Sequence, residues 1–267
     1  MSIIKIGYGN LCDSSILSGG NWTSGHPLSE IQTRELARYA QSSSADPSAT
    51  QIIMDHVSSK AAQVFGIIAH TEDDAAATIT VTRGTTSGAS DVYAGSPLAC
   101  WPFTPIDGVY NGSHFGIWVI TPAETVARYT KIAISGSQVI RIGRLFVGPI
   151  ADGGCLAYGN YADDWQPANS TVDRTENGAD WVTTRIELRS VPLSYSELTP
   201  TQASLIHEIM RTHTITGEVA LIANTEDRAA QQQYGFLGIL RKLSALEYPA
   251  YDTRSTALAI DERGGAP

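Results

Sequence analysis

Histidines beside acidic residues are the parts of this sequence that most resemble reactive chemistry. His70 stands directly before the run Thr71–Asp74, which carries three carboxylates, and His56 directly follows Asp55. An imidazole beside a carboxylate can act as a general acid or base, or can help to hold a metal ion. We expect both histidines to lie where strands run into loops, and the acidic run to form a solvated turn. The pattern therefore predicts no reactive site here.

Two further candidates lack the spacing that their chemistry needs. His207 and His213 lie six residues apart on a predicted helix, whereas a zinc site on one helix face uses residues four apart. Ser87 lies in the run Gly84–Gly88, which we interpret as a turn between strands. That run has neither the pattern of a nucleophile elbow nor an identifiable base.

Adjacent acidic residues form two pairs in predicted loops. Asp73 and Asp74 are one pair, and Asp163 and Asp164 are the other. Glycoside hydrolysis needs two carboxyl groups that face each other across a cleft, which adjacency in sequence does not provide. Acidic loop residues more often face solvent, or bind a hard cation such as calcium. We expect solvent exposure, and we predict no metal site, no cofactor site and no catalytic residue.

The tryptophans offer a different chemistry, because an exposed indole can stack on a sugar ring. They are Trp22, Trp101, Trp118, Trp165 and Trp181. Trp118 lies in an apolar run, which predicts a core position. Trp22, Trp101 and Trp165 lie in loop-like segments, where they would serve either sugar binding or packing between subunits. We favour packing.

Composition excludes several classes of function. The chain has 267 residues, 17% of them charged, and a formal net charge of −9. The densest basic stretch is Arg141 with Arg144 in a predicted strand, so we expect no nucleic-acid partner. No apolar run is long enough for a membrane span, and the apolar run near Met1 is too short for a signal peptide.

The three cysteines are Cys12, Cys100 and Cys155. They are widely spaced and form no CxxC pair or zinc-ligand pattern. One disulfide with a leftover thiol, or three reduced thiols, would fit this arrangement. We favour reduced, structural thiols in a reducing cytoplasm.

The elements that must position all these residues are mostly short strands. The predicted strands of the first half are Gln51–Asp55, Val64–His70, Thr78–Thr82, Gly116–Ile120, Tyr129–Ile134, Val139–Ile142 and Leu145–Val147. Their alternating or continuous apolar patterns, separated by Gly, Ser and Pro loops, are typical of a β-sandwich or jelly roll. Before them, Leu28–Ala40 could form a short helix.

The second half has a different character. We interpret residues 149–180 as an extended connector, with a hairpin at Asn177-Gly178. A helix should begin after the N-cap Thr199, since Pro200 and Gln202 complete a capping-box pattern. Its apolar stripe is Ala203, Ile206, Ile209 and Met210, and the strands predicted around it are Thr183–Ser190, Val219–Ala223, Tyr234–Leu240 and Thr256–Ile260.

These patterns predict a mainly β chain of two domains. A jelly-roll β-sandwich should occupy residues 1–149. Residues 150–267 should hold the connector and a smaller β-sandwich or split barrel with one packed α-helix.

Several of these segments resemble a known family. The runs Ala49–Asp55 and Val64–Thr71 resemble the opening strands of discoidin-like, galactose-binding-type jelly rolls. The runs Ala127–Ile134 and Ile140–Gly148 look like the closing strands of that fold. In tailed bacteriophages such modules occur in virion and tail proteins, where the phrase IGRLFVG leads into a Gly-rich connector. The second half is similar to the sandwich-plus-helix module of phage tail-tube and distal tail proteins.

The resemblance implies a structural protein of a bacteriophage tail tip or baseplate. Such a protein would form a homo-oligomeric ring, a hexamer or a trimer, around the tail channel. It would contact the tail tube, the hub or the fibres, and it would reside in the virion tail after assembly in the bacterial host cytoplasm. It would not be an enzyme.

Two other functions remain open from the residues. A carbohydrate-binding module for host adhesion would expose a loop tryptophan, Trp22 or Trp101, and would bind a host-surface glycan. A hydrolase acting on a cell-wall polysaccharide would bring groups such as His70 and Asp73 together in one cleft.

Overall fold

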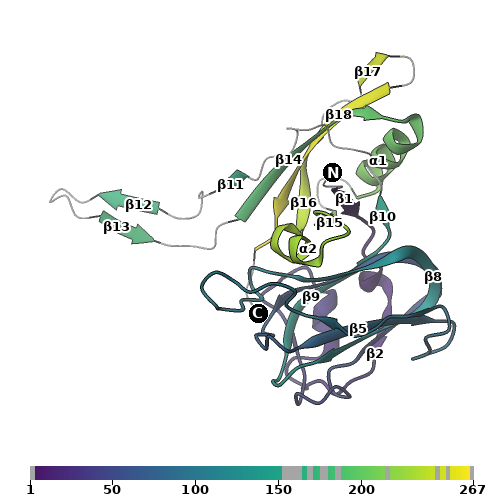
Figure 1. Ribbon diagram of the computed structural model, residues 1–267, viewed down its shortest axis with the longest axis vertical. Helices are drawn as coiled ribbons and strands as arrows, with labels where there is room; N and C mark the ends of the chain where they lie inside the picture. Colours follow the sequence, from purple (N-terminus) through teal and green to yellow (C-terminus); the bar gives the residue numbers. More distant parts are fainter. Residues whose placement is uncertain are drawn as a thin grey trace. The chain divides into compact units, whose positions relative to one another are not determined.

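The chain folds as a mainly β protein that divides into two compact units (Figure 1). The computed structural model describes residues 4–151, 164–166, 171–174, 180–183, 188–213, 217–243, 247–250 and 253–264. The first unit comprises residues 1–151, 219–236 and 265–267, and the second comprises 152–218 and 237–264. The predicted domain boundary lies between residues 149 and 150. In the structure the chain leaves the first unit close to that point, but it returns to that unit at 219–236.

The first unit contains most of the strands. Its elements are β1 (Lys5–Gly7), the 3-10 helix η1 (Leu11–Ser14), β2 (Ile16–Ser18), the 3-10 helix η2 (Leu28–Gln32), β3 (Ala40–Gln41), β4 (Ile52–His70), β5 (Thr78–Gly84), β6 (Tyr93–Ala94), β7 (Leu98–Ala99), β8 (Ile117–Ser135), β9 (Arg141–Gly148), β10 (Ile150–Ala151), β15 (Glu218–Ile222) and α2 (Arg228–Tyr234). Only η2 forms where a helix over Leu28–Ala40 was considered. In β15, the unit boundary falls after Glu218.

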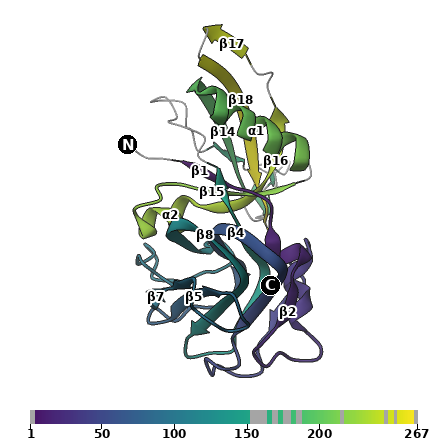
Figure 2. The ribbon, with the colours of Figure 1, turned by 90° about the vertical axis from the view of Figure 1, so that its right-hand side faces the viewer.

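Two long strands build the sandwich. β4 and β8 each run for 19 residues, and the sheet order is β3-β9-β4-β8-β5-β6. Their register shifts between Asp55 and Lys60 and again between Ala62 and Val64, where both strands bend (Figure 2). The early half of β4 pairs with β2, and its late half pairs with β9. The two halves of each strand thus belong to different layers of the sandwich.

The expectation of separate strands at Gln51–Asp55 and Val64–His70 was therefore wrong, as it was for the two halves of β8. Exposed residues Val57–Lys60 interrupt the apolar pattern, and such an interruption in a sequence is indistinguishable from a loop. In the structure these residues form a bulge within β4. Val57 has a φ of 66°, which is rare for a β-branched residue and marks the sharpness of the bend.

Residues of both layers face a shared core. The early half of β4, the late half of β8 and β5 contribute Ile52, Met54, Ile79, Val81, Ile132 and Ile134. The late half of β4, the early half of β8 and β9 contribute Phe65, Ile67, Ile117, Val119, Leu145 and Val147. All of them are nearly inaccessible to water, which is the main source of stability for such a layered fold. Trp118, predicted as a core residue, is buried as expected.

A buried arginine holds the bend between the layers. Arg83 of β5 is 0% exposed, and its guanidinium donates hydrogen bonds to both long strands. The acceptors are the backbone oxygens of Lys60, Ala62, Thr125 and Ala127 and the hydroxyls of Thr125 and Thr130. Burial lowers the pKa of Arg83 to about 10, so the side chain keeps its charge at neutral pH. One side chain thereby supplies donors to four backbone oxygens in the short stretch between the two register shifts.

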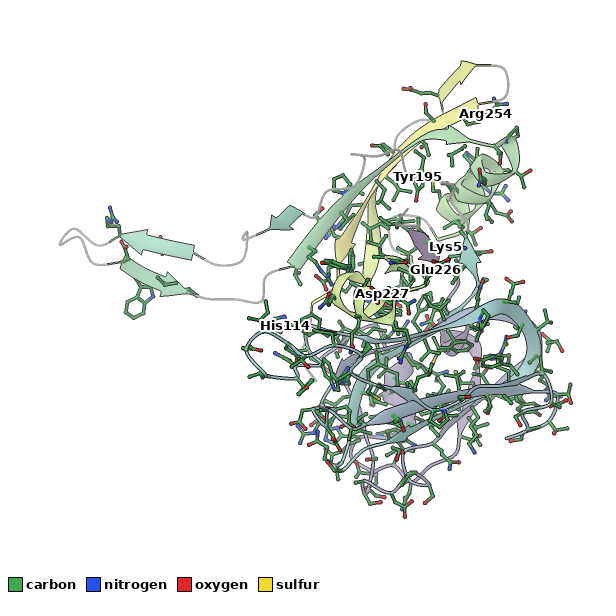
Figure 3. All side chains as sticks on the ribbon, viewed as in Figure 1. Lys5, His114, Tyr195, Glu226, Asp227 and Arg254 are labelled. Atoms are coloured by element: carbon green, nitrogen blue, oxygen red, sulfur yellow. The ribbon has the colours of Figure 1, made fainter. Side chains whose placement is uncertain are left out.

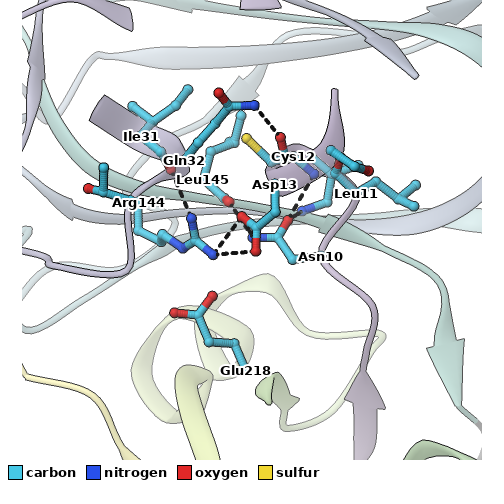
Figure 4. Close-up of polar contacts among 12 residues, drawn as sticks. Asn10, Leu11, Cys12, Asp13, Ile31, Gln32, Arg144, Leu145 and Glu218 are labelled. Carbon is cyan, nitrogen blue, oxygen red and sulfur yellow. Dashed lines mark hydrogen bonds and ion pairs between the residues drawn. The ribbon is translucent and has the colours of Figure 1, made fainter. Parts of the chain in front are cut away.

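A second buried arginine lies in the basic stretch Arg141–Arg144. Arg144 of β9 is 0% exposed and forms an ion pair with Asp13 at 2.7 Å (Figure 4). It also donates a hydrogen bond to the backbone oxygen of Ile31 at 3.2 Å. Asn10 ties the same region to β9 by donating to the backbone oxygen of Leu145 at 2.9 Å.

The second unit is built on the antiparallel order β16-β18-β14-β11. Its elements are β11 (Asp164–Gln166), β12 (Thr171–Arg174), β13 (Asp180–Thr183), β14 (Leu188–Leu198), α1 (Pro200–His213), β16 (Phe236–Leu243), β17 (Glu247–Ala250) and β18 (Thr253–Glu262). The first residue of β16, Phe236, belongs to the first unit. No helix within the described parts of the chain is long and apolar enough to cross a membrane.

Helix α1 confirms the prediction from the capping box. Thr199 accepts a hydrogen bond from the backbone N–H of Gln202 at 3.3 Å, and Gln202 accepts one from the backbone N–H of Thr199 at 3.0 Å. The predicted apolar stripe is buried: Ala203, Ile206, Ile209 and Met210. The structure also contains a second α-helix, α2, which was not predicted. Its last residue, Tyr234, was predicted to begin a strand.

The strands β12 and β13 pair only with each other among the described residues. Arg174 lies opposite Asp180 in their antiparallel register. The turn predicted at Asn177-Gly178 lies outside the described residues. Trp181 is 69% exposed and Val182 is 59% exposed. This hairpin therefore presents apolar side chains to solvent.

Candidate functional site

A pocket of about 450 Å³ opens in the first unit. Its lining consists of Phe103, Thr104, Pro105, Ile106, Asp107, Val109, Asn111, His114 and Phe115, together with Gln233 of α2. All but the last belong to the long loop between β7 and β8, on which Figure 3 labels His114. The volume lies within the range of sites that bind small molecules.

A cluster of aromatic rings gives this loop its shape. Trp101 is only 5% exposed and lies beneath the loop, with ring centroids 5.1 Å from Tyr110 and 6.3 Å from both Phe103 and Phe115. Phe103 and Phe115 meet edge to face at 5.2 Å. The hypothesis of an exposed Trp101 is therefore wrong: this indole anchors the loop, and the two half-buried phenylalanines line the pocket instead.

His70 fastens the end of the loop to the sandwich. Its Nε2 donates to the backbone oxygen of Phe115 at 3.0 Å, and its Nδ1 accepts from the backbone N–H of Glu72 at 3.2 Å. These partners fix the neutral tautomer with the proton on Nε2. A Cβ at Gly112 would lie 2.3 Å from Nδ1, so only glycine permits this approach. Because backbone groups occupy both nitrogens, His70 is not placed for acid–base catalysis.

The acidic run after His70 differs from the expected solvated turn. Asp73 is exposed, but Glu72 is only 1% exposed and accepts from the backbone N–H of Asp74 at 3.0 Å. Burial raises the pKa of Glu72. The carboxyl group turns inward because it closes the loop through this backbone hydrogen bond, a role that the sequence pattern does not reveal.

His56 lies within β4 rather than at a strand end, and it is buried in a chain of hydrogen bonds. Ser15 donates its hydroxyl proton to the backbone oxygen of Leu11 at 2.6 Å, so the 2.6 Å contact between Ser15 Oγ and His56 Nδ1 requires the imidazole to donate. Nε2 then accepts from the Thr130 hydroxyl at 2.9 Å, and that oxygen accepts from Arg83 Nε. His56 is thus a neutral structural group.

Both buried histidines should make stability depend on pH. Burial lowers the pKa of His70 to about 4, and burial together with the Arg83 charge lowers that of His56 to about 4. Unfolded histidines titrate near pH 6.5, so the unfolded state binds protons first as the pH falls. The free energy of unfolding should decline from about pH 6.5 to pH 4, by roughly 2–3 kcal/mol per histidine. Urea unfolding at pH 7.5 and at pH 5 tests this, and equal stability at the two pH values would contradict it.

Those remaining sequence candidates that the structure describes do not come together as a site. Ser87 and His207 are exposed, and the side chain of His213 and the residue Asp163 lie outside the described part. Cys12 and Cys100 are buried free thiols, and burial raises the pKa of Cys100 to about 12. Cys155 also falls outside the described residues. Within the described ranges, no three His, Cys, Asp or Glu side chains are grouped to hold a metal ion.

Two other tryptophans are of interest for binding. Trp22 is half-buried, packs against the sandwich core and donates from Nε1 to the backbone oxygen of Gly19 at 3.2 Å. Trp181 is exposed on β13. The side chain of Trp165 is not described.

Two short turns shape the pocket loop from within. Asp107 accepts from the backbone N–H of Val109 at 3.0 Å through Oδ1, and Asn111 accepts from that of Ser113 at 3.0 Å through its own Oδ1. Among the described residues, Oδ2 of Asp107 and Nδ2 of Asn111 have no hydrogen-bond partner. The loop is therefore held locally, and it presents one free acceptor and one free donor.

None of the residues that line the pocket was predicted from the sequence as a site residue. The sequence does carry one indication of a binding loop: aromatic residues alternate with Asp107-Gly108 and Asn111-Gly112 in a single segment. Such a loop is long for a sandwich and carries its own turn chemistry, which is typical of binding loops. Gln233 could not have been found this way, because it lies in a distant part of the sequence.

No family model matches the chain, and no curated protein matches it. Solved structures similar to part of it include chitosan-binding module 1, derived from a chitosanase/glucanase of Paenibacillus sp. IK-5, at 13% identity and a TM-score of 0.36 over 52% of this chain and 98% of that chain. A CBM32 module from a family 31 glycoside hydrolase of Clostridium perfringens matches at 13% identity and a TM-score of 0.37, over 53% of this chain and 98% of that chain. A further CBM32 module produced by Clostridium perfringens, in complex with GlcNAc-α-1,4-galactose, matches at 15% identity and a TM-score of 0.35, over 54% of this chain and 94% of that chain. At such TM-scores the likeness assigns this chain neither a family nor a ligand.

Proposed function

We propose that the first unit is a saccharide-binding module whose ligand occupies the pocket of the loop between β7 and β8. The observation that carries the proposal is the combination of aromatic and polar groups in that one pocket. Phe103 and Phe115 supply apolar ring surface, and Asp107, Asn111 and His114 supply polar groups beside it. A sugar ring has the matching chemistry, since its C–H faces are apolar and its hydroxyls both donate and accept hydrogen bonds.

The free polar atoms of the pocket complement a pair of hydroxyl groups. A carboxylate oxygen such as Asp107 Oδ2 can only accept a hydrogen bond, and an amide nitrogen such as Asn111 Nδ2 can only donate one. Neighbouring hydroxyls on a sugar satisfy both at once. The turns at these residues and the ring cluster around Trp101 hold the loop in place before the ligand arrives. Preorganisation of this kind reduces the entropy that binding would otherwise cost.

We further propose that the pocket binds its sugar without cleaving it. Asp107 is the only carboxylate among the lining residues, whereas glycoside hydrolysis by the usual routes needs two. His70 lies behind the loop with both nitrogens engaged, so it supplies no base. The hydrolase hypothesis, which required His70 and Asp73 in one cleft, gains no support from this arrangement.

Binding of simple sugars to the full chain tests the proposal. The probes are the methyl glycosides of glucose, galactose, mannose and N-acetylglucosamine, titrated while amide NMR shifts are recorded. We expect at least one glycoside to bind with a dissociation constant of about 1 mM or below, with shifts concentrated in residues 103–115 and no cleavage product. Shifts confined to other parts of the chain, or no binding by any probe, would overturn the proposal.

A second candidate function is the structural role in a bacteriophage tail tip or baseplate that the resemblance implies. The exposed Trp181 and Val182 on the hairpin of β12 and β13 favour it, because a lone two-stranded hairpin with apolar side chains gains stability from a partner. Under this proposal the chain forms a ring with its own copies and resides in the virion tail. The molecular mass in solution distinguishes a ring from a monomer, and a strictly monomeric chain would contradict it.

A further inference from the structure

A turn in the pocket loop holds an apolar side chain in water. Gly108 donates from its backbone N–H to the backbone oxygen of Pro105 at 3.0 Å, which closes a β-turn with Ile106 and Asp107 at its central positions. Ile106 has an exposed fraction of 109%, the highest of any large apolar residue in the described ranges. The rest of the chain therefore leaves this side chain uncovered.

Contacts on both sides hold the turn in place. Asp107 accepts from the backbone N–H of Val109 through Oδ1, and Gly108 adopts a φ of 69°, which glycine readily tolerates. Before the turn, Pro105 is buried, and after it Tyr110 belongs to the ring cluster beneath the loop. The exposed corner is therefore fixed before any ligand arrives.

The turn itself does not require an isoleucine, since the commonest β-turn accepts most residue types at its central positions. A single apolar side chain on a surface is ordinary and indicates no partner. Ile106 is not single, because Val109 on the other side of the turn is 58% exposed. Both residues line the same pocket as Phe103 and Phe115. One pocket thus combines ring surface with two water-exposed aliphatic side chains.

The pocket has room for more than one sugar ring. Its volume of about 450 Å³ lies within the range of pockets that hold drug-sized molecules, and a single hexose ring is smaller than those molecules. The hydroxyl groups of a sugar gain nothing from aliphatic side chains. A second, apolar part of the ligand therefore suits Ile106 and Val109 better than a second set of hydroxyls does.

The charges of the pocket favour an apolar substituent over an anionic one. The described lining contains no lysine or arginine, and its one carboxylate is that of Asp107. A sulfate, phosphate or carboxylate group on the sugar would therefore lie near a like charge without a cation to pair with. An uncharged alkyl or aryl group meets no such penalty.

We propose that the ligand of this pocket is a glycoside with an apolar aglycone, an alkyl or aryl group, which packs against Ile106 and Val109 while the sugar ring contacts Phe103. The proposal rests on the saccharide-binding function proposed above, and it adds a second, apolar part to the ligand. An aglycone is joined directly to the ring, so one molecule reaches both kinds of surface. Methyl glycosides then occupy only part of the site.

The test compares the methyl glycoside that the wild type binds best with the n-octyl glycoside of the same sugar, kept below its micelle-forming concentration. The full-length wild type should bind the octyl glycoside at least about tenfold more tightly, because the alkyl chain and the two aliphatic side chains leave water together. The double variant Ile106→Ser with Val109→Ser should reduce this ratio of dissociation constants to about twofold or less. The ratio is taken within one protein, since a change confined to the sugar site alters both constants alike.

Val126→Ser is the matched control for the loss of an exposed aliphatic side chain. Val126 is 57% exposed, lies on β8 and does not line the pocket, so this variant should keep the wild-type ratio.

Three results would count against the proposal. Equal affinity of the wild type for the two glycosides would overturn it and leave the saccharide-binding function intact. It would also be overturned by a double variant that keeps the wild-type ratio, or by a Val126→Ser variant that lowers the ratio as much as the double variant does. If the wild type binds no methyl glycoside, this proposal and the saccharide-binding function fail together.

Discussion

Replacing Phe103 with alanine should weaken binding of the best methyl glycoside by about thirtyfold. Phe103 is half-buried, lines the pocket and meets Phe115 edge to face at 5.2 Å, so its ring face is held ready for a ligand. Loss of an apolar ring that a ligand covers costs roughly 2 kcal/mol, which corresponds to about thirtyfold in affinity. Titration of the wild type and the variant under identical conditions measures the effect.

Two further variants separate loss of a contact from loss of the loop. Phe103→Tyr keeps the ring and should keep affinity within a few-fold of the wild type. Val126→Ala removes an exposed apolar side chain from β8 that does not line the pocket, and it should leave binding unchanged. Full affinity in Phe103→Ala would contradict the proposed site, and so would equal losses in Phe103→Ala and Val126→Ala.

Replacing Arg83 with methionine should lower the free energy of unfolding by about 4 kcal/mol. Methionine fills a similar volume, but it leaves the backbone oxygens of Lys60, Ala62, Thr125 and Ala127 without their donor at a buried bend. Each such unsatisfied acceptor costs on the order of 1 kcal/mol or more. Urea unfolding of the variant and the wild type measures the difference.

Arg128→Met is the matched control for Arg83. Arg128 also lies at the bend, but it is exposed and pairs with Asp55 on the surface, so its loss should barely change the free energy of unfolding. If Arg83→Met fails to fold, Arg83→Lys keeps the charge with fewer donors and should fold with an intermediate loss. A free energy of unfolding for Arg83→Met equal to that of Arg128→Met would refute the role of Arg83 at the bend.

The sequence predicted well those features that depend on neighbouring residues. The capping pair Thr199 and Gln202 fixes where α1 begins, and the periodic apolar stripe fixes which face it buries. The mainly β class and the sandwich follow similarly from alternating apolar runs, because period-two alternation reflects a local geometry.

The features that failed depend on partners far away in the chain. Arg83 of β5 stabilises the continuity of β4 through Val57–Lys60, and no sequence pattern within β4 indicates that contact. Trp101 was taken for a surface residue because its neighbours are loop-like, but the rings of Tyr110 and Phe115 enclose it. Helix α2 has seven residues, too few to show a periodic stripe, and its place depends on β7.

The candidate site was missed for the same reason. Its wall combines one loop with Gln233, which joins the loop only after the chain has returned from the second unit. Catalytic spacings and exposed indoles are the features that a sequence pattern can indicate. The pocket uses neither, since it relies on phenylalanine rings and on polar atoms that two turns leave free.

A crystal structure of the full chain with its best methyl glycoside tests the central claim most directly. We predict one sugar ring packed against Phe103, with hydroxyls hydrogen-bonded to Oδ2 of Asp107 and Nδ2 of Asn111. The glycosidic bond of the ligand should be uncleaved. A sugar bound elsewhere on the chain, with the pocket between the loop and α2 filled by water, would contradict the account.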